Sequence, residues 1–293
     1  MPGLPMLAPE TKENRVTTLV IGARGSVGRH VLDQLSGAGE PVRASVRNPA
    51  SAALPAGVPV VAADLAAPET LPAALAGVRQ VFLYATASGT AAFAEAARTA
   101  GVEHVVLLSS GSVLLPSARG NAVAEHHRDV ERILETSGLR WTPIRPLVLA
   151  NNALGWASSI RDAGVVRLPH PEAATAPIHE RDIAAVAVAA LRDPGREGVS
   201  DLLTGGALIS QRRQVDVLAE ATGQPIRVEE LTPAQAQEHF ERFGPPEIAK
   251  SIVEFIAAAA RGESPKTDTA QRVLGREPLT FAQWAAEHAG EFA

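Results

Sequence analysis

The amino-acid sequence predicts an α/β protein built on a doubly wound parallel sheet. Three observations favour this class. From Val16 onward, short β-branched runs alternate with Ala-rich segments of helical length. The runs are apolar almost throughout, as in strands that helices cover on both faces. The first run leads directly into three glycines at three-residue spacing, where a helical pattern begins, as in the first βα turn of a Rossmann fold.

The first half of the chain is expected to supply the sheet and most of its helices. Strands are predicted at residues 16–21, 42–46, 58–62, 80–84, 104–108 and 140–144. Helices are predicted at residues 27–35, 70–76, 91–100 and 123–135. In the last of these helices, Val123, Val130 and Leu134 lie on one apolar stripe, so we expect it to pack on the sheet.

After Pro146 the pattern loosens, and a smaller C-terminal α+β region is predicted to cover the substrate side of the sheet. Its strands are expected at residues 165–168 and 226–230, and its helices at residues 182–191, 211–222, 233–240, 248–260 and 281–289. We therefore divide the chain into an N-terminal tail (1–15), a Rossmann domain (16–150) and a substrate-covering region (151–293) that returns in part to the Rossmann sheet.

The composition indicates a soluble globular protein with a small-molecule ligand. Hydrophobic residues make up 46% of the chain and the formal net charge is −5, so neither nucleic acid nor an anionic membrane surface is expected as a partner. The absence of cysteine excludes disulfides and thiolate chemistry. The first residues lack the apolar stretch of a signal peptide, and no uninterrupted apolar run reaches membrane-spanning length. We expect a cytoplasmic protein.

The strongest motif is the phosphate loop Gly22-Ala23-Arg24-Gly25-Ser26-Val27-Gly28. Gly22 permits the tight turn, Gly25 lets the backbone approach a pyrophosphate, and Gly28 allows the helix to pack close to the strand. The helix N-terminus then offers unpaired N–H groups and a positive dipole to the phosphates. An ordinary βα turn would not need three glycines.

The residues around this loop favour NADP(H) over NAD(H). Where an NAD-binding fold carries a carboxylate after its second strand, this chain has Arg47, which can bind a 2′-phosphate together with Arg24. The alternative is that both arginines are solvated surface residues. Five further residues at predicted strand ends are expected to line the adenine and ribose pocket, the alternative being that they are simple turn residues: Asp64, Leu65, Ala85, Thr86 and Ala87. The only tyrosine, Tyr84, is expected in the core or in a pocket wall.

As an ensemble, the motifs resemble those of the NmrA-like, NAD(P)H-quinone-oxidoreductase-like group of atypical short-chain dehydrogenases/reductases. The matching segments lie within residues 16–195 and comprise Gly22–Gly28, Val46–Pro49, Ser109–Gly111, His127–Thr142, Arg145-Pro146, Asn152 and His179–Ala190. The wider superfamily uses a Tyr-x-x-x-Lys pair as its acid–base group. In this chain Val123 and His127 fall at those two positions, so the pair is absent.

The resemblance leaves two candidate catalytic residues. Ser110 matches the catalytic serine of the superfamily, and His127 matches a histidine of NmrA-like proteins that can donate a hydrogen bond or transfer a proton. Their alternatives are a strand-end hydroxyl and a helix-surface histidine. Asn152 looks like the family asparagine that could bond the nicotinamide amide, and His179 could approach the same cleft. No third ligand accompanies His127 and Glu131, so no metal site is predicted.

The leading functional hypothesis is an NADPH-dependent oxidoreductase that transfers hydride to a carbonyl, quinone or imine-like small molecule. A non-catalytic NADP(H)-sensing regulator and a redox-neutral isomerase, epimerase or cyclase remain as alternatives. The sequence does not identify the substrate, and it leaves the oligomeric state open, with a homodimer as one alternative.

Overall fold

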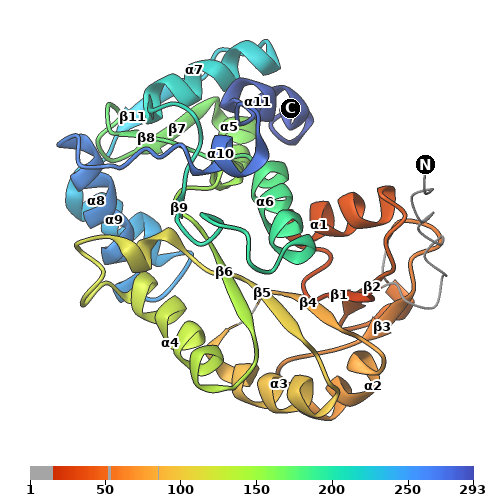
Figure 1. Cartoon of the computed structure of the whole chain (residues 1–293). Helices are drawn as coiled ribbons and strands as arrows, with labels where there is room; N and C mark the ends of the chain where they lie inside the picture. Colours follow the sequence, from red (N-terminus) through yellow and green to blue (C-terminus); the bar gives the residue numbers. More distant parts are fainter. Residues whose placement is uncertain (1–15, 52–53, 85) are drawn as a thin grey trace, which may run out of the picture.

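A parallel seven-stranded sheet forms the centre of the computed structural model, which describes residues 16–51, 54–84 and 86–293 (Figure 1). The strand order is β3-β2-β1-β4-β5-β6-β9, and every neighbouring pair is parallel. The strands are β1 (Thr18–Val20), β2 (Val42–Val46), β3 (Val60–Ala62), β4 (Gln80–Leu83), β5 (His104–Leu108), β6 (Trp141–Pro146) and β9 (Leu202–Leu203). The order reverses at β1, so the phosphate loop after β1 lies at the crevice where ligands of such sheets bind.

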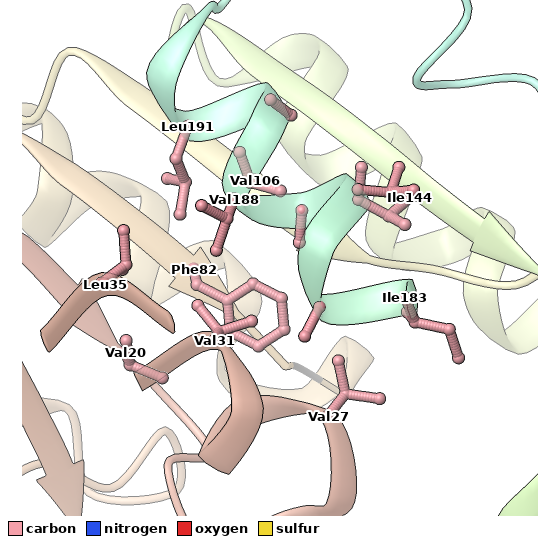
Figure 2. Close-up of a cluster of buried hydrophobic side chains, with 14 of the residues drawn as sticks. Val20, Val27, Val31, Leu35, Phe82, Val106, Ile144, Ile183, Val188 and Leu191 are labelled. Atoms are coloured by element: carbon pink, nitrogen blue, oxygen red, sulfur yellow. The ribbon is translucent and has the colours of Figure 1, made fainter. Parts of the chain in front are cut away.

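Helices cover both faces of the sheet, which confirms the doubly wound prediction. On one face, α1 (Ser26–Gly37) and α6 (Glu180–Arg192) pack over Val20, Phe82 and Val106, which lie side by side on β1, β4 and β5 (Figure 2). On the other face lie α2 (Leu71–Leu75), α3 (Ala87–Thr99) and α4 (Ala122–Thr136). Burial of both strand faces explains why the strands read as nearly continuous apolar runs.

The rest of the chain forms a smaller layer above the carboxyl end of the sheet (Figure 1). It has two short sheets, in which β7 (Val165–Leu168) pairs with β11 (Arg227–Glu230) and β8 (Ala174–Thr175) pairs with β10 (Ile209–Ser210). Its helices are α5 (Ala157–Ala163), α7 (Gln211–Thr222), α8 (Pro233–Glu241), α9 (Pro246–Ala260) and α11 (Phe281–Glu287). Helix α10 (Thr269–Leu274) instead packs on α6 and adds Ala270 and Val273 to the core of the large sheet. A separate core centred on Trp284 and Phe292 joins α5, β7, α7 and α11.

The chain also contains short 3-10 segments at loops: η2 (Pro49–Ser51), η3 (Pro68–Thr70), η4 (Gly111–Leu114), η5 (Ala150–Trp156) and η6 (Ala289–Glu291). Two of them, η4 and η5, follow β5 and β6 and therefore lie at the ligand edge of the sheet. In the described ranges, no helix is both long and apolar enough to cross a membrane.

Candidate functional site

The phosphate loop has the geometry that its three glycines predict. Gly22 has a φ of +86°, a conformation that favours glycine, and its carbonyl accepts a hydrogen bond from the Gly25 N–H at 2.9 Å. A Cβ at Gly28 would lie 2.2 Å from the Gly22 carbonyl oxygen, so only glycine lets α1 start this close to the turn. The loop therefore folds back on itself and leaves its outer side to a ligand.

The N-terminus of α1 is open. Gly25 is its N-cap, no side chain caps the helix, and no acidic residue lies in its first turn. The first N–H groups of an α-helix have no partner within the helix. In a Rossmann fold these groups bind the pyrophosphate, and a helix dipole of this polarity adds to the attraction.

Two arginines follow neighbouring strands here: Arg24 lies within the phosphate loop, and Arg47 lies beside it. Arg47 directly follows β2, Arg24 lies in the loop after β1, and the two strands are paired in register with Val20 opposite Ala44. Both side chains are exposed, and neither forms an ion pair or hydrogen bond with any residue in the described part of the chain. Two free guanidinium groups beside one phosphate loop suit a ligand with a phosphate beyond the pyrophosphate.

The residues predicted to line the adenine side form tight turns. Asp64 Oδ1 accepts from the Ala66 N–H at 3.0 Å, and Thr86 donates from Oγ1 to the Ser88 carbonyl at 3.1 Å. A Cβ at Gly89 would lie 2.2 Å from the Leu65 carbonyl oxygen, so the start of α3 packs directly on this turn. Ala87 begins α3, whereas Ala85 lies outside the described residues. Their contact with a nucleotide stays a prediction.

Ser110 and His127 lie on segments that meet at the same end of the sheet. Ser110 caps η4: its Oγ accepts from the Ser112 N–H at 3.2 Å and lies 2.9 Å from the Ser112 Oγ. His127 is half-buried on α4, which is tied to η4 by a 2.8 Å hydrogen bond from Arg128 to the Val113 carbonyl. The two residues therefore lie on connected segments at the carboxyl end of the sheet, and their catalytic role stays a prediction.

Burial sets the protonation state of His127. Desolvation, reinforced by His126 and opposed by Glu131, lowers the pKa of His127 to about 4. The ring is therefore neutral at pH 7, where it can donate one N–H or accept a proton but is not a cationic acid. A neutral imidazole fits hydrogen bonding to a substrate oxygen better than acid catalysis.

A buried network behind these two residues was not anticipated. Glu131, 9% exposed, accepts from the Ser109 hydroxyl at 2.6 Å and receives two bonds from Arg145, at 2.9 and 2.7 Å. Arg145 also donates to the Ser200 carbonyl at 3.1 Å. The network joins the ends of β5 and β6 to α4. The sequence held a sign of this network: Glu131 lies one turn after His127 on the same helix. It also follows Val130, a residue of the apolar stripe, so a buried carboxylate could have been expected there.

The structure also places two other candidates, Asn152 and Tyr84. Asn152 is exposed on η5, whereas the Oδ1 atom of its neighbour Asn151 is buried and has no partner among the described residues. The expectation that Tyr84 could be a core residue is wrong, since its side chain is 56% exposed. Tyr84 is the residue after β4, where a strand-like pattern continues past the last sheet position.

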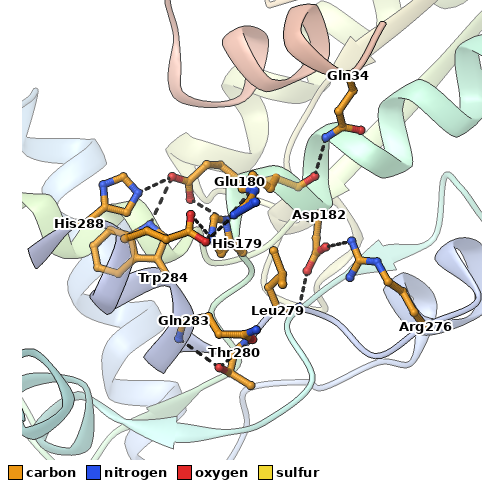
Figure 3. Close-up of polar contacts among 12 residues, drawn as sticks. Gln34, His179, Glu180, Asp182, Arg276, Leu279, Thr280, Gln283, Trp284 and His288 are labelled. Carbon is orange, nitrogen blue, oxygen red and sulfur yellow. Dashed lines mark hydrogen bonds and ion pairs between the residues drawn. The ribbon is translucent and has the colours of Figure 1, made fainter. Parts of the chain in front are cut away.

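The expectation that His179 approaches the cleft is also wrong, because the ring is 1% exposed beneath α11 (Figure 3). It caps α6 by accepting from the Arg181 N–H at 3.2 Å. Its neighbour Glu180 accepts from His288 at 3.0 Å and from Trp284 at 3.3 Å, both on the C-terminal segment. These contacts join α6 to α11 rather than to a substrate. Among the described residues, no group of three or more potential ligands could hold a metal ion.

Comparisons with known proteins agree with this geometry. A family described as NAD(P)H-binding matches residues 22–194. The chain is 38% identical, over 94% of its length and 99% of the relative, to a (4-alkanoyl-5-oxo-2,5-dihydrofuran-3-yl)methyl phosphate reductase of Streptomyces griseus. It is 37% identical, over 94% of its length and 98% of the relative, to an NAD(P)H azoreductase of Xenophilus azovorans.

A solved structure supports the same fold. The crystal structure of an Escherichia coli NADPH-dependent quinone oxidoreductase complexed with NADPH superposes with a TM-score of 0.76 and 24% identity, covering 93% of this chain and 99% of that one. The superposition extends over the small layer as well as the large sheet.

Proposed function

The chain belongs to the NAD(P)H-binding family, within its NmrA-like group of atypical short-chain dehydrogenases/reductases, and we propose that it is an NADPH-dependent reductase of conjugated double bonds. In this proposal residues 16–150 bind the cofactor and residues 151–293 cover the substrate, while α6 and β9 return to the sheet. A cytoplasmic location is expected from the dependence on NADPH. A homodimer stays a prediction.

The observation that carries the proposal is the open phosphate loop with two arginines that no described residue pairs with. Its glycine turn leaves the N-terminus of α1 free for a pyrophosphate, and Arg24 and Arg47 supply positive charge for a 2′-phosphate. These residues fit NADPH without any rearrangement of a capping side chain or an ion pair.

The substrate class follows from what the two full-length relatives have in common. One is named for an alkanoyl-substituted dihydrofuranone and the other for an azo compound. The first compound class contains a C=C bond conjugated to two carbonyl groups, and the second contains an N=N bond, so either can spread the negative charge that a hydride leaves behind. Bound NADPH supplies the hydride to such a bond. The anion that results is delocalised, so it can take its proton from water.

The residues of the site suit this class. With Val123 and His127 in place of the Tyr-x-x-x-Lys pair, the chain lacks the usual proton donor for a carbonyl oxygen. Neutral His127 and the hydroxyl of Ser110 can instead donate hydrogen bonds to the atom on which charge develops. The Ser109–Glu131–Arg145 network would hold those donors in place.

The test measures the loss of NADPH absorbance with each of four acceptors. They are a quinone, an acyl-substituted butenolide, an azo dye and a saturated ketone. We expect oxidation of NADPH with the first three and none with the ketone. Tight NADPH binding without turnover on any acceptor would contradict the proposal and favour a sensor. Substrate conversion without net loss of NADPH would identify a redox-neutral enzyme.

A further inference from the structure

Tyr84 is a large aromatic residue left exposed at the ligand edge of the sheet. It follows β4, which lies between β1 and β5. With 56% of its surface exposed, it belongs to a small group of exposed large hydrophobic residues among those described, together with Val16, Leu114, Leu208 and Phe243. An exposed ring costs solvation free energy unless a ligand or partner covers it.

The position of the ring points to the cofactor. A Cβ built on Gly22 would lie 3.1 Å from the Tyr84 Cβ and 3.8 Å from its Cγ. Tyr84 therefore stands directly beside the first glycine of the phosphate loop, between the ends of β1 and β4. No described residue forms a hydrogen bond with its hydroxyl, which leaves this group available to a ligand oxygen.

We propose that Tyr84 forms one wall of the dinucleotide site, where the bound cofactor covers its ring and accepts a hydrogen bond from its hydroxyl. The inference rests on the proposed function, because it needs NADP(H) on the phosphate loop. Tyr84 is a binding residue in this account and takes no part in proton transfer.

The sequence makes a direct test simple. Tyr84 is the only tyrosine of the chain, and there is no cysteine to consume the reagent, so tetranitromethane reports on this one phenol. We expect saturating NADPH to slow nitration of Tyr84 at least fivefold, with half-protection at the dissociation constant measured by NADPH fluorescence.

Two variants measure what the ring and the hydroxyl contribute. If the cofactor covers on the order of 60 Å² of the ring, Tyr84→Ala should weaken NADPH binding about tenfold. Tyr84→Phe should weaken it about threefold, the typical effect of one lost hydrogen bond. Leu208→Ala is the control, since it removes a comparably exposed apolar side chain outside the phosphate loop and should leave the dissociation constant unchanged.

The outcomes separate this inference from the proposed function. If NADPH binds but neither slows nitration nor depends on Tyr84, the role of Tyr84 is overturned and the proposed function stands. If Tyr84→Ala lowers the melting temperature while its affinity for NADPH stays within twofold of the original, the ring only supports the loop, and the inference is again wrong. If the unmodified protein does not bind NADPH, both proposals fail.

Discussion

At the scale of single residues, we expect charge to decide which nucleotide this fold accepts. A carboxylate after β2 would bind ribose hydroxyls and repel a 2′-phosphate, whereas this chain has Arg47 there and Arg24 in the adjacent loop. Neither guanidinium is engaged by a described side chain. Both guanidinium groups are therefore available to form charge-assisted hydrogen bonds with a ligand phosphate.

Removing Arg47 should abolish most of the preference for NADPH. A charge-assisted hydrogen bond contributes about 1.5–3 kcal/mol, so Arg47→Ala should raise the dissociation constant of NADPH roughly ten- to a hundredfold and leave that of NADH almost unchanged. Arg140→Ala, which removes an exposed arginine at the opposite end of the sheet, is the matched control. Equal losses for the two cofactors in Arg47→Ala would contradict the assignment.

The neutral state of His127 has its own kinetic consequence. Because burial lowers the pKa of His127 to about 4, the ring does not change charge between pH 5.5 and pH 8, where an ordinary histidine would titrate. We expect kcat/KM for NADPH oxidation to show no His127-dependent break in this range. A break near pH 6.5 that disappears in His127→Asn would show that the histidine acts as a titrating acid or base.

At the scale of elements, α1 contains two glycines with opposite requirements. A Cβ at Gly28 would meet the Gly22 carbonyl oxygen at 2.2 Å, whereas a Cβ at Gly37, near the end of the same helix, would meet nothing within 4 Å. The first glycine is required by close packing. The second only weakens the helix.

The two substitutions should therefore change stability in opposite directions. Gly37→Ala should raise the free energy of unfolding by about 0.5–1 kcal/mol, because alanine favours the helix. Gly28→Ala should lower it by about 1–3 kcal/mol, because the start of α1 must move away from the loop, and NADPH affinity should fall with it. Urea unfolding and cofactor titration measure both effects. A Gly28→Ala protein of unchanged affinity would show that the loop does not need this close approach.

The same scale shows why the sequence predicted some elements and missed others. Residues 42–46, 104–108 and 211–222 were placed correctly, since each carries a full period of apolar positions between clear breaks. The strands β8, β9 and β10 have two residues each and are defined by partners elsewhere in the chain, which no local pattern reveals. Helix α5 follows directly on η5 without a capping side chain, so no start signal marks it.

The candidate site was predictable to a similar degree. The phosphate loop was predicted from Gly22, Gly25 and Gly28, and the structure shows a physical need for glycine at two of them: Gly22 has a positive φ, and Gly28 leaves no room for a Cβ. The exposure of Tyr84 could not be predicted, because the apolar pattern of a strand does not show at which residue the sheet pairing ends. The burial of His179 depends on α11, more than a hundred residues later.

At the scale of the whole molecule, buried polar groups join the layers. Asp182, fully buried on α6, accepts from Arg276 and from the Leu279 N–H, both at 2.6 Å (Figure 3). Glu180 makes the equivalent connection to α11 through His288 and Trp284. Because α6 itself packs on α1 and the sheet, it connects the C-terminal segment to the cofactor-binding layer. A second connection runs to β9, where the Thr267 hydroxyl donates to the Leu202 carbonyl at 2.7 Å. We expect the two layers to unfold together.

Buried histidines make this joint stability depend on pH. His104 lies at the start of β5 with its ring 2.9 Å from the Thr142 hydroxyl, and burial, with a smaller contribution from Arg140, lowers its pKa to about 4. Burial also lowers the pKa of His179, although Glu180 and Glu287 oppose the shift. The His104 ring is therefore neutral in the folded protein at pH 7, and burial disfavours the charged form of His179 as well.

The sign of the effect follows from proton binding. Below about pH 6.5 the unfolded chain takes up protons on these histidines more readily than the folded protein does. Their full contribution to the free energy of unfolding is therefore present above the unfolded pKa, and it is lost as the pH falls toward about 4. We expect the free energy of unfolding in urea to be lower at pH 5 than at pH 7 by about 2 kcal/mol on account of His104, with His179 acting in the same direction. His104→Gln should make this dependence shallower. A free energy of unfolding that is constant or higher at pH 5 would mean that these rings are already charged in the folded protein.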